Sequence, residues 1–108
     1  TKHFPPTFTF TDEFYQAKGF SRQNARVLLR LDVSSLPPSP GYHGTDGDMP
    51  LVWAKTYGKG RVFYSSFGHD ASVWDNRDIR LMYLEAVKWA LGLVDGDTTP
   101  REMVKVTP

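Results

Sequence analysis

A histidine placed just after a buried strand is the side chain of this sequence best suited to chemistry near neutral pH. The apolar run that begins at Val62 ends in Gly68-His69-Asp70. A strand that ends in Gly-His brings an imidazole to the carboxyl edge of a sheet, where α/β proteins gather their sites, and an imidazole exchanges protons near neutral pH. His69 is therefore a candidate site residue. The alternative is that Gly68 only ends the strand and His69 hydrogen-bonds a nearby carbonyl.

The histidines and acidic residues also admit a metal site. A donor set that suits zinc would combine two histidines with one acidic residue. The candidates are His3, His43 and His69 for the histidines, and Asp12, Glu13 or Asp70 for the carboxylate. However, the chain has no His-Glu-x-x-His spacing, and its lack of cysteine removes thiolate ligands, disulfides and a thiol nucleophile. We therefore expect no metal and no cofactor.

Aromatic residues and one polar loop give candidate contacts to a ligand. Trp74 follows Gly68-His69-Asp70 in a loop, and we predict that its indole reaches a ligand, whereas Trp53, Tyr64 and Trp89 fall in predicted strands or a helix and are expected to pack in the core. His43 lies in a polar loop of residues 41–48. Loops over a site often contact substrate, but most loops have no such role.

Composition narrows the class of protein. The 108 residues include 13 basic and 12 acidic side chains, scattered along the chain, for a net charge of +1. The sequence therefore has no stripe of basic residues of the kind that binds nucleic acid. The longest helical candidate is interrupted by Arg80, Glu85 and Lys88, so we expect no membrane span. A chain without cysteine is compatible with oxidising and reducing compartments, which leaves localisation open.

The elements that must position these side chains follow from periodicity. Residues 25–31 read as a strand covered on both faces, and residues 51–57 and 61–67 as a hairpin joined by Gly58-Lys59-Gly60. Residues 33–50 form a long loop rich in proline and glycine. A helix capped by Asp75 or Asn76 and ended near Gly92 follows, and its predicted core face is Ile79, Met82, Tyr83, Ala86, Val87 and Ala90.

The order of strand, hairpin and helix predicts an α/β sheet with one face poorly covered. A sheet that is apolar on both faces needs helices on both sides. We therefore expect this chain to pack against a missing half of its domain.

Motifs along residues 1–94 resemble the trehalose-utilisation ThuA-like family. These motifs are, in order, Thr11-Asp12-Glu13-Phe14-Tyr15, Pro50-Leu51-Val52-Trp53, the run Tyr57 to Tyr64 around Gly58-Lys59-Gly60-Arg61, Gly68-His69-Asp70, Trp74, and Trp89-Ala90-Leu91-Gly92. That family is similar in fold to the class I glutamine amidotransferases, which implies a flavodoxin-like mixed sheet between helices. The match implies that residues 1–94 are the C-terminal half of such a domain and residues 95–108 a polar tail or linker.

The resemblance also implies roles for the site residues. His69 falls where the amidotransferases place their catalytic histidine, but the position two residues later, where their acid stands, is Ala71. Glutamine hydrolysis is therefore not expected. His69 becomes a general acid or base, assisted by Asp70 or Glu13, in a pocket closed by residues 33–50 and Trp74.

The acidic pair of Asp12 and Glu13 matches that of the family. One of the two is expected to orient His69 or to contact a sugar hydroxyl, so Asp12, Trp74 and His43 are the candidate sugar-binding residues. The alternative for the pair is capping of a helix or a solvated turn.

Two functions remain open. The first is a sugar-processing enzyme acting in the utilisation of trehalose or a related sugar, and the alternative is a sugar-binding or interaction module that keeps only the fold. The expected partners are a small-molecule sugar and the missing N-terminal half of the domain, with a homo-oligomer left open. Nucleic acid and membrane are not expected as partners.

Overall fold

Three antiparallel strands and one α-helix form the main regular structure of the described residues. The computed structural model describes residues 1–37 and 47–103. Its strands are β1 (Arg26–Leu31), β2 (Met49–Tyr57) and β3 (Gly60–Ser65), paired in the order β1-β2-β3. The helix α1 (Arg77–Ala90) follows, and short 3₁₀ helices occupy Val33–Ser35 and Ala71–Asp75. A sheet with a packed helix agrees with the predicted α/β class.

The predicted hairpin is confirmed, with shifted ends. The last pair of β2 and β3 is Tyr57 with Gly60, and Gly58 adopts a φ of +58° in the turn. β2 begins at Met49, earlier than expected, because Met49 already pairs with Leu31 of β1. β3 ends at Ser65, earlier than expected, since the chain turns away towards Gly68, whose φ is +123°.

The helix begins at the predicted cap. The Asn76 side chain accepts hydrogen bonds from the backbone N–H groups of Asp78 and Ile79 at 2.9 and 3.1 Å, which satisfies donors that have no partner within the helix. The chain leaves the helix at Gly92, whose φ is +77°. This left-handed conformation favours glycine, as the sequence predicts.

The core-facing stripe of α1 differs from the prediction at its C-terminal end. Ile79 and Met82 are buried as expected, but Val87 is 55% exposed and Ala90 is exposed, whereas Trp89 is buried. The Arg61 guanidinium lies 5.4 Å from the Trp89 ring, and the backbone at Gly96 packs against the indole. The predicted packing of Trp89 in the core is therefore confirmed, through contacts with β3 and the tail, whereas the prediction that Val87 and Ala90 are buried is wrong.

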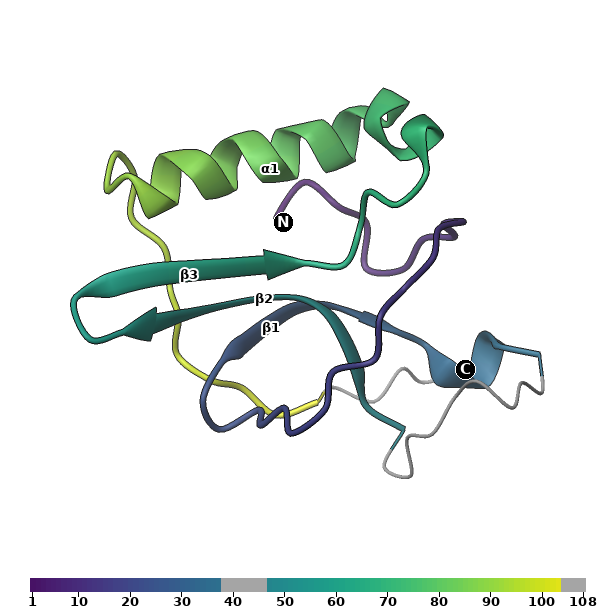
Figure 1. Ribbon diagram of the computed structural model, residues 1–108, viewed down its shortest axis with the longest axis horizontal. Helices are drawn as coiled ribbons and strands as arrows, with labels where there is room; N and C mark the ends of the chain where they lie inside the picture. Colours follow the sequence, from purple (N-terminus) through teal and green to yellow (C-terminus); the bar gives the residue numbers. More distant parts are fainter. Residues whose placement is uncertain (38–46, 104–108) are drawn as a thin grey trace.

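The main core lies where α1 and the N-terminal segment meet the sheet (Figure 1). Its buried residues are Met49, Leu51, Val52, Phe67, Val73, Ile79 and Met82. Phe4, Phe10 and Phe14 of the extended N-terminal segment pack against this cluster, and the rings of Phe10 and Phe14 both meet Phe67 edge-on at 5.1 Å. The N-terminal residues thus hold the chain that leaves β3.

A second aromatic cluster lies on the other face of the sheet. Phe63 contacts Tyr83 of α1, so the next residue, Tyr64, points away from the helix. Tyr64 stacks on its cross-strand partner Trp53 with ring centroids 5.2 Å apart, and Phe20 packs on Trp53 at 5.8 Å. Trp53 and Tyr64 are half-buried, in agreement with a packing role.

Residues 95–103 return from α1 to β1, as the yellow end of the ribbon in Figure 1 shows. The Arg101 guanidinium donates two hydrogen bonds to the carbonyl of Val27, at 2.9 and 2.7 Å. Arg26 in turn donates to the carbonyl of Thr99 at 3.1 Å. These contacts tie the tail to the first strand.

Within residues 1–37 and 47–103, no helix combines the length and the apolar character needed to cross a bilayer.

Candidate active site

The structure brings the imidazole of His69 to the carboxylate of Glu13. His69 Nε2 lies 2.8 Å from Glu13 Oε2, and the two side chains are 46% and 60% exposed. The two residues come from segments far apart in the sequence, the chain after β3 and the N-terminal segment. A solvent-accessible imidazole paired with a carboxylate is an arrangement that can take up and release a proton at a bound molecule.

Asp12 adjoins this pair and accepts backbone hydrogen bonds from both of its segments. Its Oδ2 accepts from the N–H of Gly68 at 2.8 Å, and its Oδ1 accepts from those of Glu13 at 2.8 Å and Asp70 at 3.3 Å. Burial acts to raise the pKa of Asp12, but the backbone N–H groups of Gly68, Glu13, Asp70 and His69 together outweigh it and hold this pKa below its ordinary value. Asp12 is therefore an ionised carboxylate at neutral pH.

Trp74 covers the other side of the same turn. Its indole Nε1 donates to the carbonyl of Gly68 at 3.3 Å, and the side chain is still partly accessible, because the residue is 43% exposed. A Cβ added to Gly68 would lie 2.6 Å from Trp74 Cζ2. Trp74, which the sequence predicts to contact a ligand, thus adjoins the candidate site. Its indole leaves room for no residue other than glycine at position 68.

Tyr83 supports the turn from α1. Its hydroxyl donates to the carbonyl of Phe67 at 2.5 Å, and its ring lies 4.9 Å from that of Trp74. Burial raises the pKa of the Tyr83 hydroxyl, against a hydrogen bond with Ser65 that lowers it, so the phenol remains a donor at neutral pH. Helical spacing placed Tyr83 on the core face, but no sequence signal indicated that its hydroxyl would hold the backbone before His69.

The remaining predicted site residues are placed differently. Asp70 gives its backbone N–H to Asp12, and the ion pairs of residues 1–37 and 47–103 include none between Asp70 and the imidazole. His43 lies outside the described residues. Of the histidines, His3 contacts the backbone oxygen of Asp78 through Nε2, at 2.9 Å. No group of three or more His, Cys, Asp or Glu side chains in that described part of the chain is arranged to hold a metal ion.

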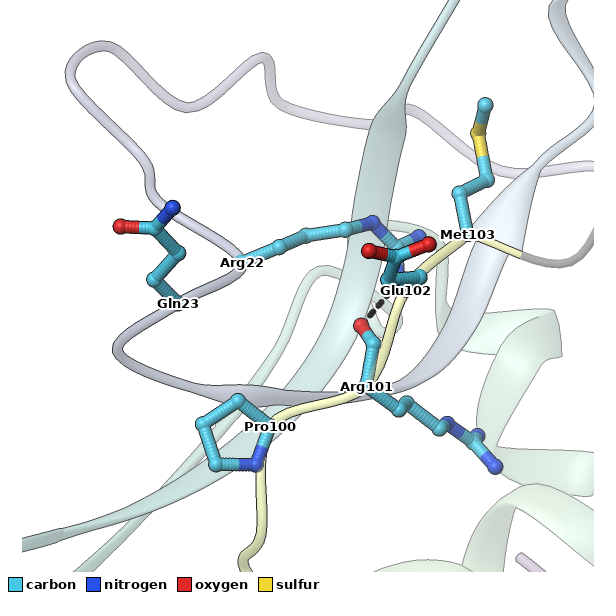
Figure 2. A pocket seen from close by; sticks show the side chains of 6 residues that line it. All are labelled: Arg22, Gln23, Pro100, Arg101, Glu102 and Met103. Carbon is cyan, nitrogen blue, oxygen red and sulfur yellow. Dashed lines mark hydrogen bonds between the residues drawn. The ribbon is translucent and has the colours of Figure 1, made fainter.

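An open depression elsewhere on the surface contains none of these residues. It lies between the segment before β1 and the C-terminal tail, and Figure 2 shows its lining of Arg22, Gln23, Pro100, Arg101, Glu102 and Met103. The Arg22 guanidinium is bound to Asp48 by two hydrogen bonds and reaches the carbonyl of Arg101 at 3.4 Å. Since its arginines already bind partners within the chain, we place the candidate site at His69.

Comparison with known proteins decides the family. The model of the ThuA family, described as trehalose utilisation, matches residues 1–90. The chain belongs to the ThuA family. The matched span includes the His69–Glu13 pair, Asp12 and Trp74, so the whole candidate site lies within the family domain. No curated protein and no solved structure matched the chain. The family's description links the chain to trehalose utilisation.

Proposed function

We propose that this ThuA-family chain processes trehalose or a related sugar, with His69 as general acid or base and Glu13 as its partner. The observation that carries the proposal is the 2.8 Å contact between the two accessible side chains. The partly exposed indole of Trp74 lies beside the same turn, and an indole face is a suitable surface for the apolar face of a sugar ring.

The geometry supports a simple division of labour. With Nε2 of His69 held by Glu13, the other ring nitrogen, Nδ1, is left to accept a proton from a sugar hydroxyl or to return one to a leaving oxygen. The Glu13 carboxylate stabilises the imidazolium that forms when Nδ1 takes up the proton. Asp70, whose backbone N–H binds Asp12, and His43, which lies outside the described residues, complete the proposed set.

Removal of the imidazole tests this proposal. His69→Ala in the full chain should lower turnover of the sugar by about 100-fold or more, because general acid–base catalysis contributes at least that much. The melting temperature should change little, since the side chain is half exposed. His3→Ala removes another histidine and is the matched control, which should keep wild-type turnover. Unchanged turnover in His69→Ala would remove His69 from the mechanism.

A second candidate is sugar binding without chemistry. The partly exposed indole of Trp74 favours it, because a stacking surface binds a sugar whether or not His69 transfers a proton. Under this alternative, trehalose or a related sugar raises the melting temperature of the wild-type chain and is recovered unchanged. Formation of product that depends on His69 would reject it.

We also propose that the chain is the C-terminal half of a flavodoxin-like domain. The sheet packs α1 on one face and carries Trp53, Tyr64 and Phe20 on the other. Further helices could pack on an aromatic face of this kind and cover it. The missing N-terminal half would supply those helices and the second wall of the sugar site.

A further inference from the structure

The Asp12 carboxylate binds the backbone on both sides of His69 and also the backbone of Glu13. One oxygen binds the N–H of Gly68, just before His69, and the other binds the N–H groups of Asp70, just after it, and of Glu13. We infer that Asp12 is a positioning residue, which holds His69 and Glu13 in contact without itself touching the substrate. The inference deepens the proposed function and rests on it for its catalytic meaning.

The turn around His69 presents its N–H groups to a single anion. Gly68 and Asp70 donate to different oxygens of Asp12, at 2.8 and 3.3 Å, so the carboxylate spans the two ends of the turn. Backbone N–H groups that converge in this way form a nest, a common anion-binding arrangement in proteins. Here the anion is supplied by the chain itself, which fixes the backbone on either side of the imidazole.

The same carboxylate fixes the other member of the pair. Glu13 follows Asp12 directly, and its own N–H donates to Asp12 Oδ1 at 2.8 Å. The backbone that carries the Glu13 side chain and the backbone that carries the His69 side chain are therefore both held by the Asp12 carboxylate. Any change that releases Asp12 from the nest loosens both sides of the 2.8 Å contact.

The pair cannot maintain this geometry by its own attraction. Its side chains are 46% and 60% exposed, and ion pairs with such access to water contribute little to stability. The backbone that carries His69 must therefore be held by other contacts. Trp74 and Tyr83 bind the carbonyl groups of Gly68 and Phe67, but among the contacts described here Asp12 is the one that binds the N–H groups.

Asp12→Ala should separate the pair while leaving the core in place, because Asp12 is not among the residues of the buried cluster. The signal is the ¹⁵N resonance of His69 Nε2 in the full chain, assigned by its loss in His69→Gln. In the wild-type chain Glu13→Gln should shift this resonance. In the Asp12→Ala background the same substitution should have no effect on it.

A small carboxylate provides a second readout. Formate added to Asp12→Ala should enter the vacated nest and restore the response to Glu13→Gln, whereas chloride at equal ionic strength should not. Asp12→Asn keeps the size of the side chain with one acceptor oxygen, and it should weaken the response. It replaces Asp12→Ala in the experiment if that variant does not fold. Asp95→Ala, at an exposed position, is the matched control and should preserve the wild-type response.

The outcomes separate this inference from the proposed function. A shift of His69 Nε2 by Glu13→Gln that is as large in the Asp12 variants as in the wild-type chain would overturn the positioning role. If the Asp12 variants lose the response but His69→Ala keeps full sugar turnover, the positioning role stands and the catalytic proposal fails. If His69→Ala abolishes turnover while the Asp12 variants keep both the response and the turnover, the catalytic proposal stands and the positioning role fails.

Discussion

At the scale of the residue, Gly68 is constrained both by its backbone conformation and by its neighbour Trp74. Its φ of +123° is a conformation that L side chains rarely adopt, and Trp74 occupies the space where a Cβ would lie. Gly58 also has a positive φ, of +58°, but no atom lies within 4 Å of the place its Cβ would take. The two glycines share a positive φ but differ in the space around them.

Gly68→Ala should destabilise the chain more than Gly58→Ala does. The strained backbone costs about 1–3 kcal/mol at either position, and the clash with Trp74 adds about 1–3 kcal/mol at Gly68 alone. Urea unfolding of both variants measures the difference. Equal losses of stability would show that the indole moves aside freely, and would contradict its proposed role in holding the turn.

Residue type, together with the family resemblance, indicated the participants that carry side-chain chemistry. His69, Glu13 and Trp74 are recognisable because an imidazole, a carboxylate and an indole have distinctive uses, and the structure places all three around one turn. The hydrogen bonds of Asp12 and Tyr83 could not be predicted in the same way. Both bind backbone groups, and every residue offers the same N–H and carbonyl, so the sequence carries no mark of the partner.

At the scale of the element, α1 buries one face and leaves another exposed. Ile79 is fully buried and Met82 nearly so, whereas Leu84 is 53% exposed. Ile79→Ala should lower the free energy of unfolding by about 2–5 kcal/mol, since it leaves a cavity in the core. Thermal or urea unfolding of the purified variant measures this loss.

Leu84→Ala is the matched control on the same helix. It removes a comparable apolar side chain from an exposed position, so the free energy of unfolding should stay within about 0.5 kcal/mol of the wild-type value. A loss as large as that of Ile79→Ala would mean that the exposed face of α1 is covered in solution.

Periodicity predicted the hairpin and the helix better than it predicted which of their side chains are buried. The hairpin and the helix follow from apolar alternation, a Gly-Lys-Gly turn and an Asn cap, which are local signals. Trp89 is buried against Arg61 and Gly96, which approach from β3 and the tail, whereas Val87 is 55% exposed. Helical spacing places both positions at the edges of the core face, so long-range contacts decide which of the two is buried.

At the scale of the whole molecule, polar contacts tie the tail and the N-terminal segment to the rest of the fold. Arg101 binds the Val27 carbonyl of β1, Arg22 binds Asp48, and Asp12 connects the N-terminal segment with the chain after β3. These contacts join parts that are distant in sequence. The composition did not predict these contacts, because it shows only that charges of both signs are scattered along the chain.

Three aspartates that accept backbone hydrogen bonds within the fold should make stability fall in acid. The pKa values of Asp12, Asp32 and Asp97 lie below their ordinary value. A depressed pKa means that the folded chain binds the proton less readily than the unfolded chain does. The stabilisation is therefore complete above the ordinary aspartate value, about pH 4, and is lost as the pH falls below it through the folded values.

Asp12→Asn should reduce this acid sensitivity, because an amide cannot take up the proton that releases the nest. The variant should be less stable than the wild-type chain at neutral pH, and the two should converge as the pH falls below about 4. Urea unfolding at a series of acidic pH values measures both slopes. Asp95→Asn, the same substitution at an exposed position, should keep the wild-type slope. A constant gap between Asp12→Asn and the wild-type chain at every pH would mean that the Asp12 charge contributes nothing to holding the Gly68–Asp70 backbone.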